Sequence, residues 1–217
     1  EDKLINRNHL AKLTAHEEER FLKLHPKSGE LFEKAKQSMP GGVPMSWMAK
    51  WPGAYPVFID QAKGARFTDV DGNSYIDFCL GDTGSMTGHS PDATVAAIRE
   101  QAGKGITAML PTADAAIVSA ELANRLGLPL WQFTVSATDA NRHVIRYSRM
   151  ITGRSKIVVI DRCYHGSVDE TFATLDAAGN TVKREGNIGA PVDLSETTRV
   201  VEFNNLAAME AALAHGD

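Results

Sequence analysis

The sequence contains few cysteines and no recognisable pattern of metal ligands. Only two cysteines, Cys79 and Cys163, occur in 217 residues. Two isolated thiols do not form a disulfide framework, and their spacing fits no metal site. We therefore expect a protein of the reducing cytoplasm that binds no metal.

Long apolar runs and an excess of basic residues are also lacking. No apolar stretch approaches the roughly 20 residues that a membrane-spanning helix needs. The N-terminal segment is too charged for a signal peptide. With 23 basic and 27 acidic residues the net charge is −4, which points away from nucleic acid and membrane surfaces. Hydrophobic residues make up 43% of the chain, enough for a globular core.

The first eighty residues predict two helices followed by a small antiparallel sheet. Helix-forming residues run from 8 to 38, and His25-Pro26 predicts a break between two helices. The second helix ends at Met39-Pro40-Gly41-Gly42. Asp71-Gly72-Asn73 between apolar residues is typical of a hairpin turn. Three short strands are expected at 57–59, 65–67 and 75–78.

Helices and strands alternate after residue 78, which predicts a mostly parallel sheet covered by helices. Helices are expected at 92–102, 111–126, 138–150 and 206–214, and strands at 131–135, 156–160 and 198–203. Residues 173–194 contain Gly, Ala and Pro and predict a long surface loop. The fold class is therefore α/β. We expect a helical and β-meander domain over residues 1–80 and the first part of a larger α/β domain over 81–217.

A turn of small residues between a predicted strand and helix forms the first candidate site. Ser136, Ala137, Thr138 and Asp139 would expose backbone N–H groups at the positive end of a helix dipole, where a phosphate can bind. An ordinary helix cap, with Ser136 or Thr138 as the capping residue, explains the same pattern. Spacing alone leaves both interpretations open.

The second candidate site follows the strand expected at 156–160. In Cys163-Tyr164-His165-Gly166 an aromatic ring could stack on a flat cofactor, and the glycine would permit close approach. A tyrosine packed into the core at the end of the strand is the alternative interpretation.

Seven segments together resemble the class III aminotransferases, which are pyridoxal-phosphate (PLP) enzymes of fold type I. The resemblance covers about residues 30–214. Within that class the chain is most similar to glutamate-1-semialdehyde aminomutases and aromatic β-amino-acid transaminases. The segments, matched in order and spacing, are Met39–Val43, Thr68–Asp77, Gly88–Pro91, Ser136–Ala140, Thr152–Ile157, Tyr164–Gly166 and Phe203–Asn205.

The resemblance implies a cofactor site. The backbone amides of Ala137 and Thr138, in the turn that begins at Ser136, would hold the PLP phosphate. Alanine replaces the usual glycine, so a positive φ at residue 137 is not expected. Tyr164 would stack on the cofactor ring, and His165 and Gly166 would shape the same wall.

The same resemblance implies a homodimer with shared active sites. Pro111-Thr112 matches a loop that in this family reaches the phosphate of the partner subunit, so Thr112 would belong to the partner's site. The lysine that forms the Schiff base and the aspartate on the pyridine nitrogen come after the Phe203–Asn205 region in the family. We therefore expect the chain to continue beyond Asp217, and none of its own lysines matches that position.

The residues around the expected substrate pocket favour an apolar substrate. The arginine with which aminomutases pair the substrate carboxylate falls on Met48, and the family's active-site tryptophan falls on Asp82. A thioether cannot replace a guanidinium clamp. Trp47 and Met48 lie in an apolar loop suited to a hydrophobic pocket, although Trp47 and Trp51 could simply pack the small domain.

We therefore expect a transaminase that moves the amino group of an aromatic β-amino acid or arylalkyl amine to a 2-oxo acid. The alternatives are a glutamate-1-semialdehyde 2,1-aminomutase, a racemase or decarboxylase of the same cofactor class, and a non-catalytic phosphate-binding domain. The last alternative would be expected to carry a nucleotide-type Gly-rich loop, and the sequence has none.

Overall fold

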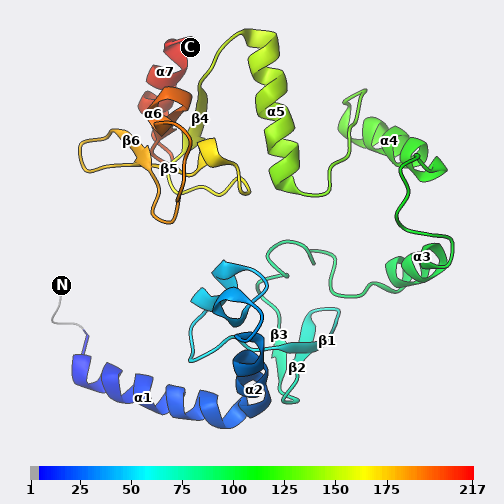
Figure 1. The fold of residues 1–217 in the computed structure, drawn as a ribbon, viewed down its shortest axis with the longest axis vertical. Helices are drawn as coiled ribbons and strands as arrows, with labels where there is room; N and C mark the ends of the chain where they lie inside the picture. Colours follow the sequence, from blue (N-terminus) through cyan, green and yellow to red (C-terminus); the bar gives the residue numbers. More distant parts are fainter. Residues whose placement is uncertain (1–4) are drawn as a thin grey trace. The chain divides into compact units, whose positions relative to one another are not determined.

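The computed structural model describes residues 5–217, which divide into two compact units, one that ends at Leu110 and one that covers Pro111–Asp217 (Figure 1). Among the described residues the first unit contains helices and a three-stranded sheet, and the second contains helices and two two-stranded sheets, in agreement with the predicted α/β class. The predicted domain boundary between residues 80 and 81 stays a prediction. The first four residues of the predicted domain over 1–80 lie outside the described part of the chain.

The first unit begins with two helices joined at the predicted break. Helix α1 covers Arg7–Leu24 and α2 covers Pro26–Ala35. Proline at the first position of α2 suits a helix start, because the N–H that it lacks has no intrahelical partner there. Two short 3₁₀ turns follow, η1 at Pro40–Gly42 and η2 at Ser46–Lys50.

The predicted meander forms, with its strands shifted by one to four residues at their ends. Strands β1 (Ile59–Lys63), β2 (Arg66–Asp69) and β3 (Ser74–Ile76) pair antiparallel in the order β1-β2-β3. Helix α3 follows at Asp92–Ala102, as predicted. The hairpin turn is built on Asp69, whose carboxylate accepts the N–H groups of Asp71 and Asn73 at 3.0 and 2.8 Å.

The second unit contains the start of a parallel sheet. Helix α4 covers Ala113–Leu126 and α5 covers Ala137–Thr152. Strand β4 (Ile157–Ile160) pairs parallel with β7 (Thr198–Val201), and α7 (Leu206–Ala214) follows β7. The helix predictions in this unit are confirmed within one or two residues.

The strand expected at Trp131–Val135 does not form. Among the described residues β4 pairs only with β7, so this segment has no neighbouring strand to complete its hydrogen bonds. Val135 is fully exposed. The apolar run at 131–135 therefore does not form a paired strand.

The long loop expected at residues 173–194 is also wrong, because this segment folds into a hairpin and a short helix. Strands β5 (Ala173–Leu175) and β6 (Thr181–Lys183) pair antiparallel, and α6 covers Leu194–Thr197. Ala173 and Leu194 are buried against Val159 of β4 and Val200 of β7, and this cluster is the core of the second unit.

One turn design occurs in both units. Asp176 accepts the N–H groups of Ala178 and Asn180, each at 2.8 Å, just as Asp69 accepts those of Asp71 and Asn73. In both turns the glycine before the asparagine has a positive φ, 91° at Gly72 and 82° at Gly179. The Asp-x-x-Gly-Asn spacing at 176–180 therefore carried the hairpin signal that the loop prediction missed.

Candidate cofactor site

The first turn of α5 is capped by Ser136. The Ser136 Oγ accepts the Asp139 N–H at 3.2 Å and donates to the Asp139 carboxylate at 3.0 Å. Ser136 itself is extended, with φ −146° and ψ 160°, as an N-cap residue requires. Ala137 is the first helical residue and is not among the described residues with positive φ, as its Cβ led us to expect.

The cap leaves two backbone donors free at the positive end of the helix. The Asp139 N–H is satisfied by the Ser136 side chain and the Ala140 N–H by the Ser136 carbonyl at 3.1 Å. Within residues 5–217 no acceptor is found for the N–H groups of Ala137 and Thr138. The cap and the phosphate site are therefore compatible interpretations, because they use different N–H groups.

The loop after β4 lies directly against this turn. The Ser167 N–H donates to the Thr138 Oγ1 at 2.9 Å. A Cβ placed on Gly166 would lie 2.5 Å from the Thr138 Oγ1 and 2.9 Å from the Thr138 nitrogen, and Gly166 has φ 79°. Only glycine permits this conformation and this close approach to Thr138.

Two further residues of α5, which the sequence analysis missed, hold the same loop. The Asn141 amide donates to the His165 carbonyl at 2.8 Å, and the Arg142 guanidinium donates to the Ser167 carbonyl at 3.2 Å. Asn141 lies three residues after Thr138 and so shares its face of the helix. That spacing was the available signal, but only the fold shows what the face contacts.

Tyr164 and His165 have different environments within this loop. Tyr164 is 70% exposed, and its ring centroid lies 6.5 Å from that of Phe172. The interpretation of Tyr164 as a core residue is therefore wrong. His165 is half-buried, and its Nε2 is buried without a hydrogen-bond partner among the described residues.

Thr112 stands apart from these contacts. It is the N-cap residue of α4, and its side chain makes no capping hydrogen bond. Within the described chain it forms no hydrogen bond with the 136–138 turn or the 164–167 loop. Its proposed place in a partner's site is not tested by the structure.

The predicted substrate-pocket residues lie in the first unit. Trp47 and Trp51 are 43% and 54% exposed, with ring centroids 6.4 Å apart in an edge-to-face arrangement. Met48 lies beside them in η2 and is half-buried. Asp82 is exposed with φ 53° in a strained loop. The exposed fractions of Trp47 and Trp51 show that much of the surface of both rings is not packed against the rest of the first unit.

His89 anchors that strained loop. Its Nε2 lies 2.7 Å from the Asp77 carboxylate, and its backbone pairs with Gly64 in both directions. Asp77 in turn accepts the N–H groups of Cys79, Leu80 and Gly81. These bonds give His89 a structural role in the turn.

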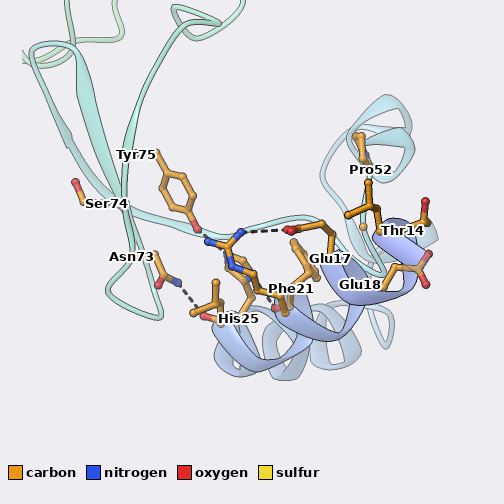
Figure 2. Close-up of a pocket in the computed structure, with 13 residues that line it drawn as sticks. Thr14, Glu17, Glu18, Phe21, His25, Pro52, Asn73, Ser74 and Tyr75 are labelled. Carbon is orange, nitrogen blue, oxygen red and sulfur yellow. Dashed lines mark hydrogen bonds and ion pairs between the residues drawn. The ribbon is translucent and has the colours of Figure 1, made fainter. Parts of the chain in front are cut away.

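A cavity of about 810 Å³ lies in the first unit and is lined by none of the predicted site residues (Figure 2). It runs along α1 between Leu13 and Phe21. At its polar end the Tyr75 hydroxyl contacts the His25 Nε2 at 2.6 Å and donates to the Asp69 carboxylate at 2.8 Å. Burial and the bond to Asp69 raise the pKa of Tyr75 to about 12. This network joins the α1–α2 corner to the meander.

No cluster of three or more His, Cys, Asp or Glu side chains in residues 5–217 could hold a metal ion. No helix in the same range is long and apolar enough to cross a membrane.

The chain is similar in sequence to known proteins. The family description "Aminotransferase class-III" matches residues 47–207. The glutamate-1-semialdehyde 2,1-aminomutase of Methanocaldococcus jannaschii is 34% identical over 188 residues, which cover 86% of this chain and 44% of the relative.

Solved structures agree with this family match. A glutamate-1-semialdehyde aminomutase from Pseudomonas aeruginosa PAO1 is 50% identical, with a TM-score of 0.92 over 98% of this chain and 47% of that chain. A variant of it in complex with PMP is 49% identical, with a TM-score of 0.91 over the same shares. A β-phenylalanine aminotransferase from Variovorax paradoxus is 25% identical, with a TM-score of 0.79 over 94% of this chain and 44% of that chain.

The chain belongs to the class III aminotransferase family. The family and fold predictions are thereby confirmed. The chain spans less than half the length of these relatives.

Proposed function

We propose that this chain carries the phosphate- and ring-binding part of a PLP-dependent aminotransferase. The observation that carries the proposal is the pair of unpartnered N–H groups at Ala137 and Thr138, at the positive end of α5. Gly166 packs directly against Thr138, and the exposed Tyr164 ring lies on the same loop. These features fit a cofactor with a phosphate arm and a flat ring.

When bound, PLP supplies an electron sink for the carbanion of an amino substrate. The residues of this chain would hold and orient it. The amides of Ala137 and Thr138 would donate to the phosphate, with Ser136 fixing the turn. Tyr164 would stack on the ring, and His165 and Gly166 would form the adjoining wall. The resemblance assigns none of the lysines of this chain to the Schiff-base position.

For the reaction, we favour transfer of the amino group from an aromatic β-amino acid or arylalkyl amine to a 2-oxo acid. Met48 stands where the aminomutase resemblance expects an arginine, and a thioether offers a carboxylate no charge partner. The half-exposed rings of Trp47 and Trp51 provide aromatic surface in the same loop. The 25% identical relative from V. paradoxus is a β-phenylalanine aminotransferase.

An aminomutase is the second candidate. The supporting observation is the 50% identity to the glutamate-1-semialdehyde aminomutase from P. aeruginosa over nearly the whole chain. This identity is twice that to the β-phenylalanine aminotransferase. An aminomutase would keep the same cofactor contacts but return the amino group to its own substrate.

We also propose a homodimer in which Thr112 contributes to the partner's phosphate site. The support is the position of Thr112, whose hydroxyl makes no capping bond at the start of α4. Mixing Thr112→Ala subunits with subunits inactivated in their own cofactor site would test this. With shared sites the hybrid dimer keeps one site whose own cofactor residues and whose partner Thr112 are both intact, so its activity should exceed the average of the two parent dimers. Independent sites predict simple averaging. The cytoplasmic location stays a prediction.

A substrate panel on the full-length enzyme distinguishes the reactions. Aromatic β-amino acids and arylalkyl amines are offered with a 2-oxo acid, and glutamate 1-semialdehyde is offered alone. Amino transfer to the 2-oxo acid supports the transaminase. Isomerisation of glutamate 1-semialdehyde without activity on the aromatic donors would support the aminomutase. A protein that gains no visible cofactor absorption with added PLP would be a binding module.

A further inference from the structure

The loop that carries Tyr164 is held by hydrogen bonds on both sides of that residue. On one side the Arg184 guanidinium donates to the Cys163 carbonyl at 3.2 Å. On the other side the Asn141 amide donates to the His165 carbonyl at 2.8 Å. Tyr164 therefore lies between two tethered carbonyls, although its own side chain is 70% exposed. Its position is set by the backbone and not by burial of the ring.

The Asn141 tether connects this loop to the helix that carries the phosphate turn. Asn141 and Thr138 lie one turn apart on α5, and both bond to residues 165–167. Gly166, which is buried, fits between these two bonds in direct contact with Thr138. Contacts within the protein alone therefore join the phosphate turn and the stacking loop into one assembly. Such preorganisation lowers the ordering cost of binding.

We propose that Asn141 is a positioning residue for the cofactor, because its amide sets the distance between the Tyr164 ring and the phosphate-binding amides. This inference rests on the proposed PLP function. Asn141 need not touch PLP, since it acts through the His165 carbonyl. The Asn141 side chain is also the only amide side chain of α5 within reach of this loop, because Asn141 is the sole Asn or Gln of the helix.

Three variants of the full-length enzyme test the role. Asn141→Ala removes the donor. Asn141→Asp keeps the shape but places a carboxylate opposite the His165 carbonyl. Asn180→Ala is the matched control, because it also removes an Asn side-chain bond (3.1 Å to Asp176) but on the exposed β5–β6 turn. Melting temperature and circular dichroism establish that each variant folds.

The main readout compares PLP with inorganic phosphate, which competes for the phosphate turn alone. Loss of one net hydrogen bond predicts a PLP dissociation constant raised about 3- to 10-fold in Asn141→Ala, and more in Asn141→Asp. The inhibition constant for inorganic phosphate should stay unchanged in both, because the turn is intact. Asn180→Ala should match wild type for both ligands. A merely structural defect would weaken both ligands together.

Amide hydrogen exchange of residues 163–168 in the cofactor-free enzyme supplies a second readout. The proposal predicts faster exchange in Asn141→Ala and no change in Asn180→Ala. Unchanged exchange, or faster exchange with an unchanged PLP dissociation constant, would overturn the positioning role while wild-type PLP binding still supports the proposed function. Absence of PLP binding in the wild-type enzyme would overturn the proposed function, and this inference with it.

Discussion

Gly166 packs against Thr138 so closely that a Cβ at residue 166 would lie 2.5 Å from the Thr138 hydroxyl oxygen and 2.8 Å from its Cα. The contact joins the loop after β4 to the first turn of α5. Both segments were predicted as halves of one site from separate sequence motifs. The structure brings these halves into contact within the second unit.

Substitution Gly166→Ala should therefore damage the site in two ways. The φ of 79° is unfavourable for alanine, which costs more than about 1 kcal/mol, and the Cβ displaces Thr138. We expect a lower melting temperature and weaker PLP binding by fluorescence titration. Gly179→Ala is the control, since Gly179 has φ 82° but nothing within 4 Å of its Cβ position. Equal PLP affinities in the two variants would contradict the contact's role.

Ser136→Ala tests the cap. The Asp139 N–H loses its acceptor, which should cost about 1 kcal/mol of stability. The turn that presents the Ala137 and Thr138 amides also loosens, so PLP affinity should fall. Asn205 caps α7 in the same way, accepting the Ala208 N–H at 3.0 Å. Asn205→Ala should match the stability loss and leave PLP affinity unchanged. If both variants bind PLP like wild type, the turn does not hold the phosphate.

Tyr164 is predicted to act through its ring and not its hydroxyl. Tyr164→Phe should bind PLP with nearly wild-type affinity. Tyr164→Leu should bind about 2- to 10-fold more weakly, the range expected for loss of an aromatic stacking contact. Because the side chain is 70% exposed, neither change should lower the melting temperature much. Wild-type affinity in the leucine variant would exclude the ring as a cofactor contact.

Asp69 should make the first unit sensitive to acid. Burial alone would raise the pKa of this carboxyl. Hydrogen bonds from Asn73, Tyr75 and the Asp71 N–H lower the pKa by a larger amount, so the net pKa is below its usual value. A lowered folded-state pKa contributes stability above the unfolded pKa of about 4 and loses it as pH falls through the folded pKa.

The melting temperature of the full-length enzyme should therefore fall as pH drops below about 4. Asp69→Asn should flatten this dependence and lower stability at neutral pH by about 1–3 kcal/mol, because buried donors lose a charged acceptor. Asp176→Asn changes the matching exposed turn and should have a smaller effect. Unchanged acid sensitivity in Asp69→Asn would show that other groups control it.

Much of the fold could be predicted because its signals are local. The His25-Pro26 break, the Asp71-Gly72-Asn73 turn and the helical periodicity of 206–214 each determine structure over a few residues. The strand expected at 131–135 failed for the opposite reason. A strand needs a neighbour, and periodicity carries no information about which neighbours are present.

The candidate site likewise contains residues that local sequence signals identify and a residue that they do not. Ser136 could be identified as a cap from its sequence neighbours, and the Tyr164–Gly166 motif from its similarity to the family. Asn141 could not, because its partner is the carbonyl of His165, 24 residues away and dependent on how α5 packs. A backbone acceptor leaves no mark on residue type, so this contact required the structure.

The central claim is that the Ala137 and Thr138 amides bind the phosphate of PLP. The most direct test compares the dissociation constants of PLP and pyridoxal, which lacks the phosphate, for the full-length enzyme. Two charge-assisted hydrogen bonds predict that PLP binds at least about 100-fold more tightly than pyridoxal. Equal affinity for the two compounds, or binding of neither, would contradict the account.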